Sequence, residues 1–237
     1  MQEKEAVRIN KYLSQIGYCS RRKADELLQQ NRITVDGKVP ELGTKVFPGS
    51  DICVDGKPVN QTKKEFVYLL LNKPKGIVCT TDTRVEENNI IDYINYPERI
   101  FPVGRLDKMS EGLIMLTNDG EIVNKILRAK HKNEKEYLVK VNQKITEEFL
   151  HKMSNGVPIL DTVTLPCKVT KIDDYQFKIV LTQGLNRQIR RMCEALEYKV
   201  MALKRIRIMH MVLDIPQGEY RTLSKEEVKR LKSYLDY

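Results

Sequence analysis

The sequence lacks any hydrophobic run long enough to cross a membrane. Its longest apolar run, Phe66–Leu71, has six residues, whereas a membrane-spanning helix needs about 20. The first five residues are mostly charged and no apolar segment follows them, so we expect no signal peptide. These two absences predict a cytoplasmic protein with no membrane partner.

Paired cysteines and clustered histidines are also absent. The five cysteines lie far apart, with no C-x-x-C spacing, and the three histidines cluster neither with them nor with one another. An odd number of scattered cysteines is typical of free thiols in a reducing compartment. No group of residues has the spacing of a zinc site. We therefore expect neither disulfides nor a metal.

The chain does carry an excess of positive charge. Its 41 Lys and Arg outnumber 32 Asp and Glu, giving +9 and a pI near 9.2, which suits a polyanionic partner. A solvated basic surface would explain the net charge equally well, so the position of the charge matters. Between Gly184 and Met211, seven basic residues stand against two acidic ones, a local excess of +5. This window predicts a basic patch.

Length and pattern predict two domains. A chain of 237 residues can form one large domain and one small one, and 41% hydrophobic with 31% charged residues is typical of a soluble globular protein. We predict a small domain at 7–61, a polar linker at 62–65 and a large domain at 66–237. No internal repeat is visible. In the large domain short strands alternate with helices, which predicts an α+β fold with a mixed, mostly antiparallel sheet.

The small domain begins with two predicted helices. Ile9, Leu13 and Ile16 have helical spacing, and this helix ends near Gly17. Ser20 can cap a second helix, whose apolar stripe is Ala24, Leu27 and Leu28. Two Asp-Gly dipeptides, Asp36-Gly37 and Asp55-Gly56, predict hairpin turns between short strands.

Three cations, Arg21, Arg22 and Lys23, occupy the first turn of the second predicted helix. Positive charge at that end opposes the helix dipole. A sequence that tolerates this penalty indicates a use for the charge, such as contact with phosphate. A solvated basic helix face is the alternative.

The large domain contains a series of predicted strands and helices. We predict strands at Phe66–Leu71, Leu113–Thr117, Glu136–Val141, Thr162–Lys171 and Gln176–Thr182, with an extended segment at Lys199–Leu213. We predict helices at Ile90–Tyr96, at Ile122–Leu127 with Lys125 and Arg128, after a cap at Thr146, from a cap at Asn186 to about Tyr198, and after a capping box at Ser224–Glu227. The turn Asn72–Gly76, with Lys73 and Lys75, is expected to end the first strand.

The candidate reactive group is Asp107 in the segment Arg105-Leu106-Asp107. The segment precedes the apolar run Leu113–Leu116, and Gly104 and Gly112 flank it, so we expect a tight loop at the mouth of a core strand. Taken alone the tripeptide is weak evidence. A loop ion pair worth less than about 1 kcal/mol explains it more simply.

Three further features strengthen the candidate. Tyr137 stands in a strand of otherwise apolar and charged residues, although a core tyrosine is the more common fate of such a residue. In the segment 184–196, the residues Ile189, Met192, Cys193 and Leu196 are expected to form a buried stripe. Arg187, Arg190 and Arg191 are expected on an adjacent face, near a helix N-terminus that suits phosphate or carboxylate. Lys204, Arg205 and Arg207 could form a basic track along a strand.

Two resemblances follow from these motifs. The segments RINKYL, SRRKA and ITVDG resemble the S4 RNA-binding domain. With LNKPKG, PVGRLD, KEYLV and GLNRQIRRMCEAL in this order, the whole chain resembles the bacterial RsuA/RluB/RluE/RluF family of pseudouridine synthases, most of all the RluF branch. That family isomerises a uridine in folded RNA without a cofactor. The resemblance implies a stem-loop of 23S ribosomal RNA as partner and a monomeric enzyme, and leaves a tRNA as second substrate open.

The resemblance also implies roles for single residues. Asp107 is the nucleophile, and whether it attacks the sugar, attacks the base or acts through a glycal is left open. Arg105 fills the space vacated by a flipped uridine or holds its phosphate. Tyr137 packs on the uracil ring, Arg190 (or Arg187) pairs with Asp107, and Ile189 forms the pocket floor. Further RNA contacts are expected from Leu106, Lys108 and Gln188, and in the S4-like domain from Arg8, Lys11, Arg21, Arg22 and Lys23.

Two residues depart from the family pattern. Met109 stands where relatives often have an acid, which affects a polar contact near the loop. Glu197 stands where a glycine often ends the helix, so a different cap is expected. The main alternative function is a non-catalytic RNA-binding ribosome assembly factor. A metal-dependent hydrolase is a third alternative, but the sequence shows no His/Asp/Glu cluster near Asp107 that could bind the metal.

Overall fold

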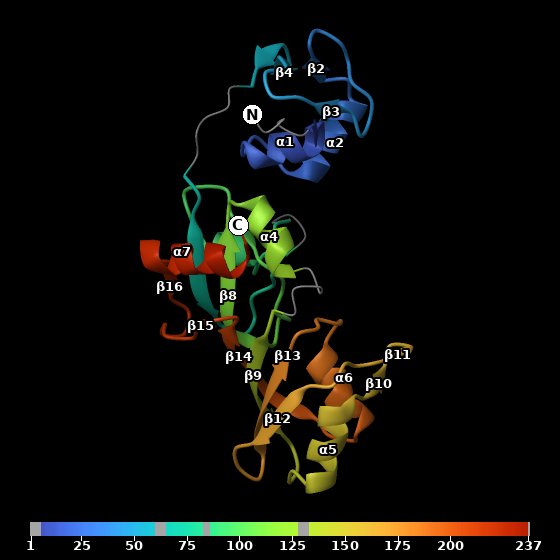
Figure 1. Ribbon diagram of the computed structural model, residues 1–237, viewed down its shortest axis with the longest axis vertical. Coiled ribbons are helices and arrows are strands. Elements are labelled where there is room, and N and C mark those ends of the chain that lie inside the picture. Colours follow the sequence, from blue (N-terminus) through green and yellow to red (C-terminus); the bar gives the residue numbers. More distant parts are fainter. Residues whose placement is uncertain (1–5, 60–64, 83–85, 128–132, 237) are drawn as a thin grey trace. The chain divides into compact units, whose positions relative to one another are not determined.

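A computed structural model describes residues 6–59, 65–82, 86–127 and 133–236 (Figure 1). The chain divides into two compact units. The amino-terminal unit holds Met1–Phe66 with Asn118–Gly120, and the carboxy-terminal unit holds Val67–Thr117 and Glu121–Tyr237. Except for Glu65, the predicted linker at 62–65 lies outside the described residues, as does Arg128.

The amino-terminal unit is two helices packed on short strands. Helices α1 (Ile9–Gln15) and α2 (Arg21–Gln29) bury the predicted apolar residues, and the Ser20 hydroxyl accepts the Lys23 N–H at 3.0 Å. Both Asp-Gly pairs have positive φ, as two-residue hairpin turns require. The strands are β1 (Val7–Arg8) paired with β3 (Lys45–Val46), and β2 (Ile33–Val35), β4 (Ile52–Val54) and β5 (Lys57–Pro58) in a second sheet.

The carboxy-terminal unit is built on one sheet of nine strands in the order β12-β13-β9-β14-β8-β6-β16, with β15 added to β14 and β7 to β8. Among the described strands only β14 and β8 pair in parallel. This confirms the predicted α+β fold with a mixed, mostly antiparallel sheet. The strands are β6 (Tyr68–Lys73), β7 (Phe101–Pro102), β8 (Glu111–Thr117), β9 (Lys135–Val141), β12 (Lys168–Lys171), β13 (Gln176–Leu181), β14 (Val200–Ile208), β15 (Met211–Val212) and β16 (Tyr220–Thr222).

Helices cover both faces of this sheet. On one face, α4 (Gly120–Leu127) and α7 (Lys225–Tyr234) pack on Leu70 and Met115. On the other face, α3 (Ile90–Ile94) packs on the β6–β8 half, while α5 (Glu147–Asn155) and α6 (Gln188–Ala195) pack on the β9–β13 half (Figure 1). Tyr137 packs against both clusters of that second face, so it lies where they meet.

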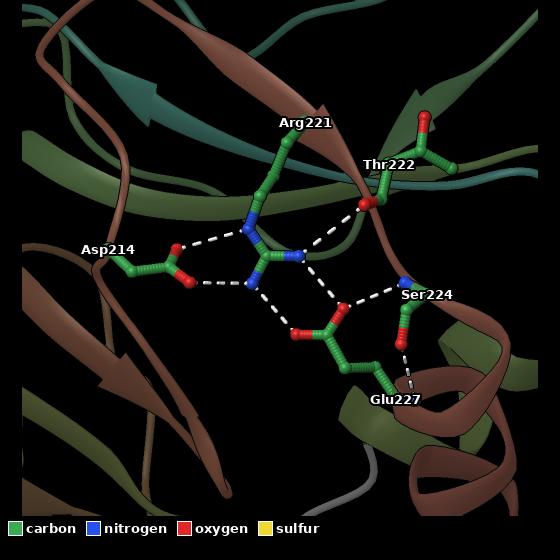
Figure 2. Close-up of polar contacts among 5 residues, drawn as sticks. All are labelled: Asp214, Arg221, Thr222, Ser224 and Glu227. Atoms are coloured by element: carbon green, nitrogen blue, oxygen red, sulfur yellow. Dashed lines mark hydrogen bonds and ion pairs between the residues drawn. The ribbon is translucent and has the colours of Figure 1, made fainter.

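Arg221 joins α7 to the edge of the sheet. From β16 it donates two hydrogen bonds to Asp214, at 3.1 and 2.8 Å, and two to Glu227 of α7, both at 2.8 Å. Glu227 also completes the predicted capping box with Ser224 (Figure 2). A bidentate guanidinium–carboxylate pair is among the stronger polar contacts in proteins, so this network fixes the start of α7.

Two predicted strands are interrupted in the structure. The segment predicted as Thr162–Lys171 is two pieces, because β11 (Thr162–Val163) pairs with β10 (Pro158–Ile159) in a separate hairpin before β12 begins. Pro166 between them lacks the N–H that a continuous ladder needs. The extended segment at Lys199–Leu213 is likewise β14 and β15 joined by a turn, in which Met209 has a φ of 50°.

Two termini also differ from their predictions. Strand β6 extends through Asn72 to Lys73, beyond its predicted end at Leu71. Asn186 does not cap α6; Arg187 occupies the N-cap position in the left-handed region and its side chain makes no cap bond. The oxygens of Asn186 instead accept hydrogen bonds from Arg191 at 3.1 and 3.2 Å. The sequence spacing alone does not show whether the Asn186 side chain bonds to the first N–H groups of the helix or to Arg191.

The end of α6 explains how the chain manages without a glycine. Glu197 has a φ of 66°, and the N–H groups of Glu197 and Tyr198 bond to the carbonyls of Glu194 and Cys193 at 3.0 and 2.8 Å. This is the pattern of a Schellman cap, in which the left-handed position is usually glycine. Here the cap forms with a side chain that the conformation disfavours.

We expect Glu197→Gly to raise the free energy of unfolding by about 0.5–1 kcal/mol, because the relief of left-handed strain exceeds the greater flexibility of glycine in the unfolded chain. Chemical denaturation would measure it. Glu197→Ala is the control, since it removes the charge but keeps Cβ. Equal gains from both variants would assign the effect to the charge and contradict the cap argument.

Candidate active site

The loop that carries Asp107 connects β7 to β8 on the face of the sheet occupied by α3. Within it the Ser110 N–H bonds to the Asp107 carbonyl at 3.0 Å and closes a turn. Leu106 is buried and anchors the loop in the core, whereas Arg105, Lys108 and Met109 are exposed. The Asp107 side chain is 40% exposed. The carboxylate is thus held on a fixed turn and is accessible to a ligand.

Residues that follow β6 contact the backbone of the Asp107 loop. The Gly76 N–H bonds to the Lys108 carbonyl at 2.8 Å, and the Leu106 N–H points at the Cys79 sulfur at 3.4 Å. Gly76 and Cys79 together therefore fix the backbone on both sides of Asp107.

Arg190 from α6 lies beside the carboxylate. Its Nε is 4.0 Å from Asp107 Oδ2, and its Nη2 donates to the Met109 carbonyl at 3.2 Å and to the Ser110 hydroxyl at 3.3 Å. The guanidinium side chain is 14% exposed. Arg190 thus ties α6 to the Asp107 loop and places a positive charge next to the carboxylate. The position of Met109 contributes its backbone carbonyl, while its side chain points to solvent.

The other residues expected on α6 are more dispersed. Arg187 lies 3.9 Å from Glu194, an exposed pair, and so does not join Arg190 at the carboxylate. Gln188 is buried and its amide bonds to the Leu185 N–H and to Gln183. Ile189 is 4% exposed and packs in the core cluster that includes Val139. The predicted stripe of the helix is confirmed, but its arginines do not share one face.

Tyr137 belongs to a row of residues that crosses the sheet beneath the Asp107 loop. Lys73 on β6 stands opposite Gly112 on β8, Gly112 opposite Arg205 on β14, and Arg205 opposite Tyr137 on β9. Residues directly opposite in neighbouring strands share a face. The row therefore places two cations and an aromatic ring on one face, with a gap at the glycine.

Gly112 is required where the row is tightest. A Cβ on it would lie 2.2 Å from the Arg205 carbonyl oxygen, and its φ is 106°. Only glycine accommodates both conditions.

Lys73 is a fully buried cation in this row. Its ammonium donates to the carbonyls of Pro74 at 2.9 Å and Ile77 at 2.8 Å, and so it folds the turn that supports the Asp107 loop. Burial lowers its pKa, while Cys79 and Asp107 act in the opposite direction. The sequence shows a lysine in LNKPKG but gives no sign that it turns inward.

The predicted basic track along β14 is wrong. Arg205 is 3% exposed and donates to the Leu113 carbonyl at 2.6 Å, while Arg207 donates to Glu134 and Glu136 at 2.9 and 2.8 Å. A bulge between the two arginines turns them to opposite faces. Strict alternation, on which the prediction depended, fails at a bulge.

The thiols near this region are unsuited to act as nucleophiles at neutral pH. Burial raises the pKa of Cys79, and it raises the pKa of Cys193 to about 12 and that of Cys167 to about 11. Only the thiolate is reactive. No group of three metal-ligating side chains occurs among the residues that the structure describes. The accessible carboxylate of Asp107 is thus the best candidate for covalent chemistry at this site.

The basic residues singled out in the amino-terminal unit lie on or next to its two helices. Arg8 precedes α1, and Arg21 and Arg22 begin α2; all three are exposed. Lys23 is exposed and forms an ion pair with Glu26 at 3.0 Å, and Lys11 is half-buried. No acidic residue offsets the charge in the first turn of α2.

Both units match known protein families. Residues 67–195 match the family model described as RNA pseudouridylate synthase, and residues 7–52 match the S4 domain model. A solved structure described as the crystal structure of a pseudouridylate synthase superposes with a TM-score of 0.70 and 29% identity, over 95% of this chain and 99% of that one.

Two curated relatives extend the match over almost the whole chain. The dual-specificity RNA pseudouridine synthase RluF of Escherichia coli strain K12 is 52% identical over 94% of this chain and 77% of its own length. The ribosomal large subunit pseudouridine synthase B of Bacillus subtilis strain 168 is 36% identical over 97% of both chains. No described helix is long and apolar enough to cross a membrane.

Proposed function

The chain belongs to the RNA pseudouridylate synthase family and carries an S4 domain, and from this premise we propose that it isomerises a specific uridine in folded RNA with Asp107 as the nucleophile. The observation that carries the proposal is the placement of an accessible carboxylate beside Arg190, on a loop whose Leu106 belongs to the core cluster against which Tyr137 packs. Isomerisation exchanges one bond of uracil for another, so one carboxylate and a retained base suffice.

Arg190 supports the carboxylate in this role. Its Nε lies 4.0 Å from Asp107 Oδ2, so it places a positive charge beside the carboxylate without a short contact that would have to break. Its hydrogen bonds to Met109 and Ser110 also hold the turn in place when RNA binds. Pre-organisation of this kind removes part of the entropic barrier to reaction.

The target uridine has to leave its stack to reach Asp107. A base in a helix is sterically inaccessible to an enzyme, so enzymes that act on bases flip them out. Arg105 is exposed two residues from Asp107 and is suited to occupy the vacated position or to hold a flanking phosphate. Tyr137 offers the ring on which the flipped uracil packs. Lys108, although paired with Glu86 at 2.9 Å, is exposed and can contact the backbone.

We propose a stem-loop of 23S ribosomal RNA as the substrate, since the relatives include a ribosomal large subunit pseudouridine synthase and a dual-specificity enzyme. The protein should release tritium from RNA that contains uridine tritiated at carbon 5, because carbon 5 loses its hydrogen when it bonds to the sugar. Transcripts of 23S RNA fragments and of tRNA would be compared. Chemical mapping of pseudouridines in cells with and without the protein then gives the position.

A non-catalytic assembly factor is the alternative. It would bind the same RNA and release no tritium from any transcript. That result would overturn the proposed isomerase function and leave RNA binding intact.

The S4 unit is proposed to supply affinity through phosphate contacts. Changing Arg21, Arg22 and Lys23 to glutamine together should weaken RNA binding and lower the slope of log affinity against log salt by roughly 2–3, because each lost phosphate contact removes about 0.7–0.9 of the slope. Filter binding over a salt series would measure it. At saturating RNA the single-turnover rate should stay unchanged, since these residues touch no reacting atom.

A matched control is available in the same unit. Lys38 and Lys57 are exposed and lie away from α1 and α2 along the sequence. Changing both to glutamine removes the same charge as changing Arg21 and Arg22 together, and we expect a much smaller change in slope. Equal slopes for these two double variants would show that net charge, not a phosphate contact at α2, governs binding.

A further inference from the structure

Arg205 has hydrogen-bonding capacity that the protein does not use. It is 3% exposed, its Nε donates to the Leu113 carbonyl, and its Nη2 has no acceptor among the residues that the structure describes. An unsatisfied buried donor destabilises the folded state, and more so when it is charged. Such a cost is commonly tolerated at a functional site.

The surroundings of Arg205 are rich in positive charge. The guanidinium carbon lies 6.0 Å from the centre of the Tyr137 ring, and the neighbour across Gly112 is the buried Lys73. Lys135 is also close enough that Arg205 lowers its pKa. Buried like charges repel strongly because little water screens them. The positive charges of this row therefore favour the binding of a negatively charged group beside it.

The chemistry of the proposed reaction creates negative charge at this place. When the bond between uracil N1 and the sugar C1′ breaks, the bonding electron pair stays with the ring and gives a uracil anion delocalised over N1, O2 and O4. This holds whether Asp107 displaces the base at C1′ or removes a sugar proton to form a glycal. If Asp107 adds to the base instead, the ring also becomes an anion. A uracil on Tyr137 would have Arg205 as its nearest buried guanidinium in the row.

We propose that Arg205 stabilises the detached uracil anion electrostatically, from the row behind Tyr137, and holds the ring in the site while it turns. N1 keeps the electron pair of the broken bond and later binds a proton with it. In the displacement route the pair of the C5–C6 double bond attacks C1′ and the Asp107 carboxylate departs. In the glycal route C5 bonds to C1′ while the C1′–C2′ double bond takes its proton back from Asp107 at C2′. In both routes loss of the C5 proton restores the C5–C6 double bond. Charge and atoms balance without an added reactant.

This inference rests on the proposed function and adds a residue to it. Preorganised positive charge aimed at a developing anion is worth about 10²–10³-fold in rate per donor. Lys73 shares the row, but its ammonium donates to the backbone carbonyls of Pro74 and Ile77. Arg205 is thus the cation of the row that lies over the Tyr137 ring, and because its unbonded Nη2 is buried it acts on the anion through its charge and not through a direct hydrogen bond.

The test compares uridine with 5-fluorouridine in the same stem-loop. Fluorine makes the uracil anion intrinsically more stable, so it needs less help from the protein. Single-turnover loss of the target nucleoside, followed by nuclease digestion and chromatography, is measured for Arg205→Met and Arg205→Gln. We expect a loss of about 10²-fold with uridine and a clearly smaller loss with 5-fluorouridine. Arg205→Lys, which keeps the charge, should recover most of the rate on uridine.

Arg205→Gln keeps a donor for the Leu113 carbonyl and so provides a folded neutral variant if Arg205→Met is unstable. Arg207→Met is the control on the same strand, because Arg207 forms its ion pairs on the opposite face. It should affect both substrates by the same factor, whatever that factor is. The same factor for uridine and 5-fluorouridine in both neutral Arg205 variants would mean a structural role and overturn the inference. Failure of the wild type to convert uridine in any RNA would instead overturn the proposed function.

Discussion

Asp107→Asn should abolish pseudouridine formation, with a loss of about 10⁴-fold or more in single-turnover rate, as expected when the group that forms the covalent bond is removed. The amide has the same shape and cannot attack as an anion. The Asp107 side chain is 40% exposed, and its ion pair with Arg190 spans 4.0 Å. Its replacement should therefore change the free energy of unfolding by no more than about 0.5 kcal/mol. Tritium release and a thermal melt would measure the two quantities.

RNA binding separates this result from a binding defect. The variant should bind the stem-loop about as tightly as the wild type, because Asp107 contributes chemistry rather than phosphate contacts. Tritium release within tenfold of the wild-type rate would contradict a nucleophilic role. A loss of release together with an equal loss of affinity would assign Asp107 to binding.

Gly112→Ala should destabilise the carboxy-terminal unit by about 4 kcal/mol, the sum of overpacking and backbone strain. The new methyl group would lie 2.2 Å from the Arg205 carbonyl oxygen, and alanine would have to adopt a φ of 106°. The atoms in contact are backbone atoms of β14, which cannot move without breaking the only parallel pairing described in the sheet. A loss of this size exceeds half the stability of many domains.

Gly76→Ala separates the two causes. Gly76 has a φ of 89° and no atom within 4 Å of its built Cβ. It should therefore show only the conformational cost, about 1–2 kcal/mol. The chain has no tryptophan, so urea denaturation of both variants would be monitored by far-ultraviolet circular dichroism to give the two values. Similar losses would mean that the contact with Arg205 relaxes freely and that strain alone makes glycine necessary.

Motif order was sufficient to find the candidate loop. Arg105-Leu106-Asp107 is a weak signal alone, but its order with KEYLV and GLNRQIRRM limits the families that the chain can resemble. The helix caps at Ser20, Thr146 and Ser224 were also predictable, because a cap depends on residues three positions apart. Interactions between residues so close in the chain can be predicted from the sequence alone.

The floor of the site was not predictable in the same way. Lys73 was expected in the turn that ends the first strand and Arg205 on a basic track, yet Lys73 belongs to β6 and both side chains are buried. Their positions depend on which strands become neighbours, with β6, β8, β14 and β9 side by side although they are far apart in the chain. A bulge in β14 then decides which arginine points inward. Neither property has a local signature.

The sequence by itself determined the family, the α+β class and the identity of the candidate nucleophile, since each depends on residue types at short, fixed spacing. Only the tertiary structure decided that Arg190 rather than Arg187 lies beside Asp107. It also brought Lys73, Gly112, Arg205 and Tyr137 into one row. The physical reason is that strand pairing and register set side-chain neighbours across a sheet, and pairing between distant segments is a property of the whole fold.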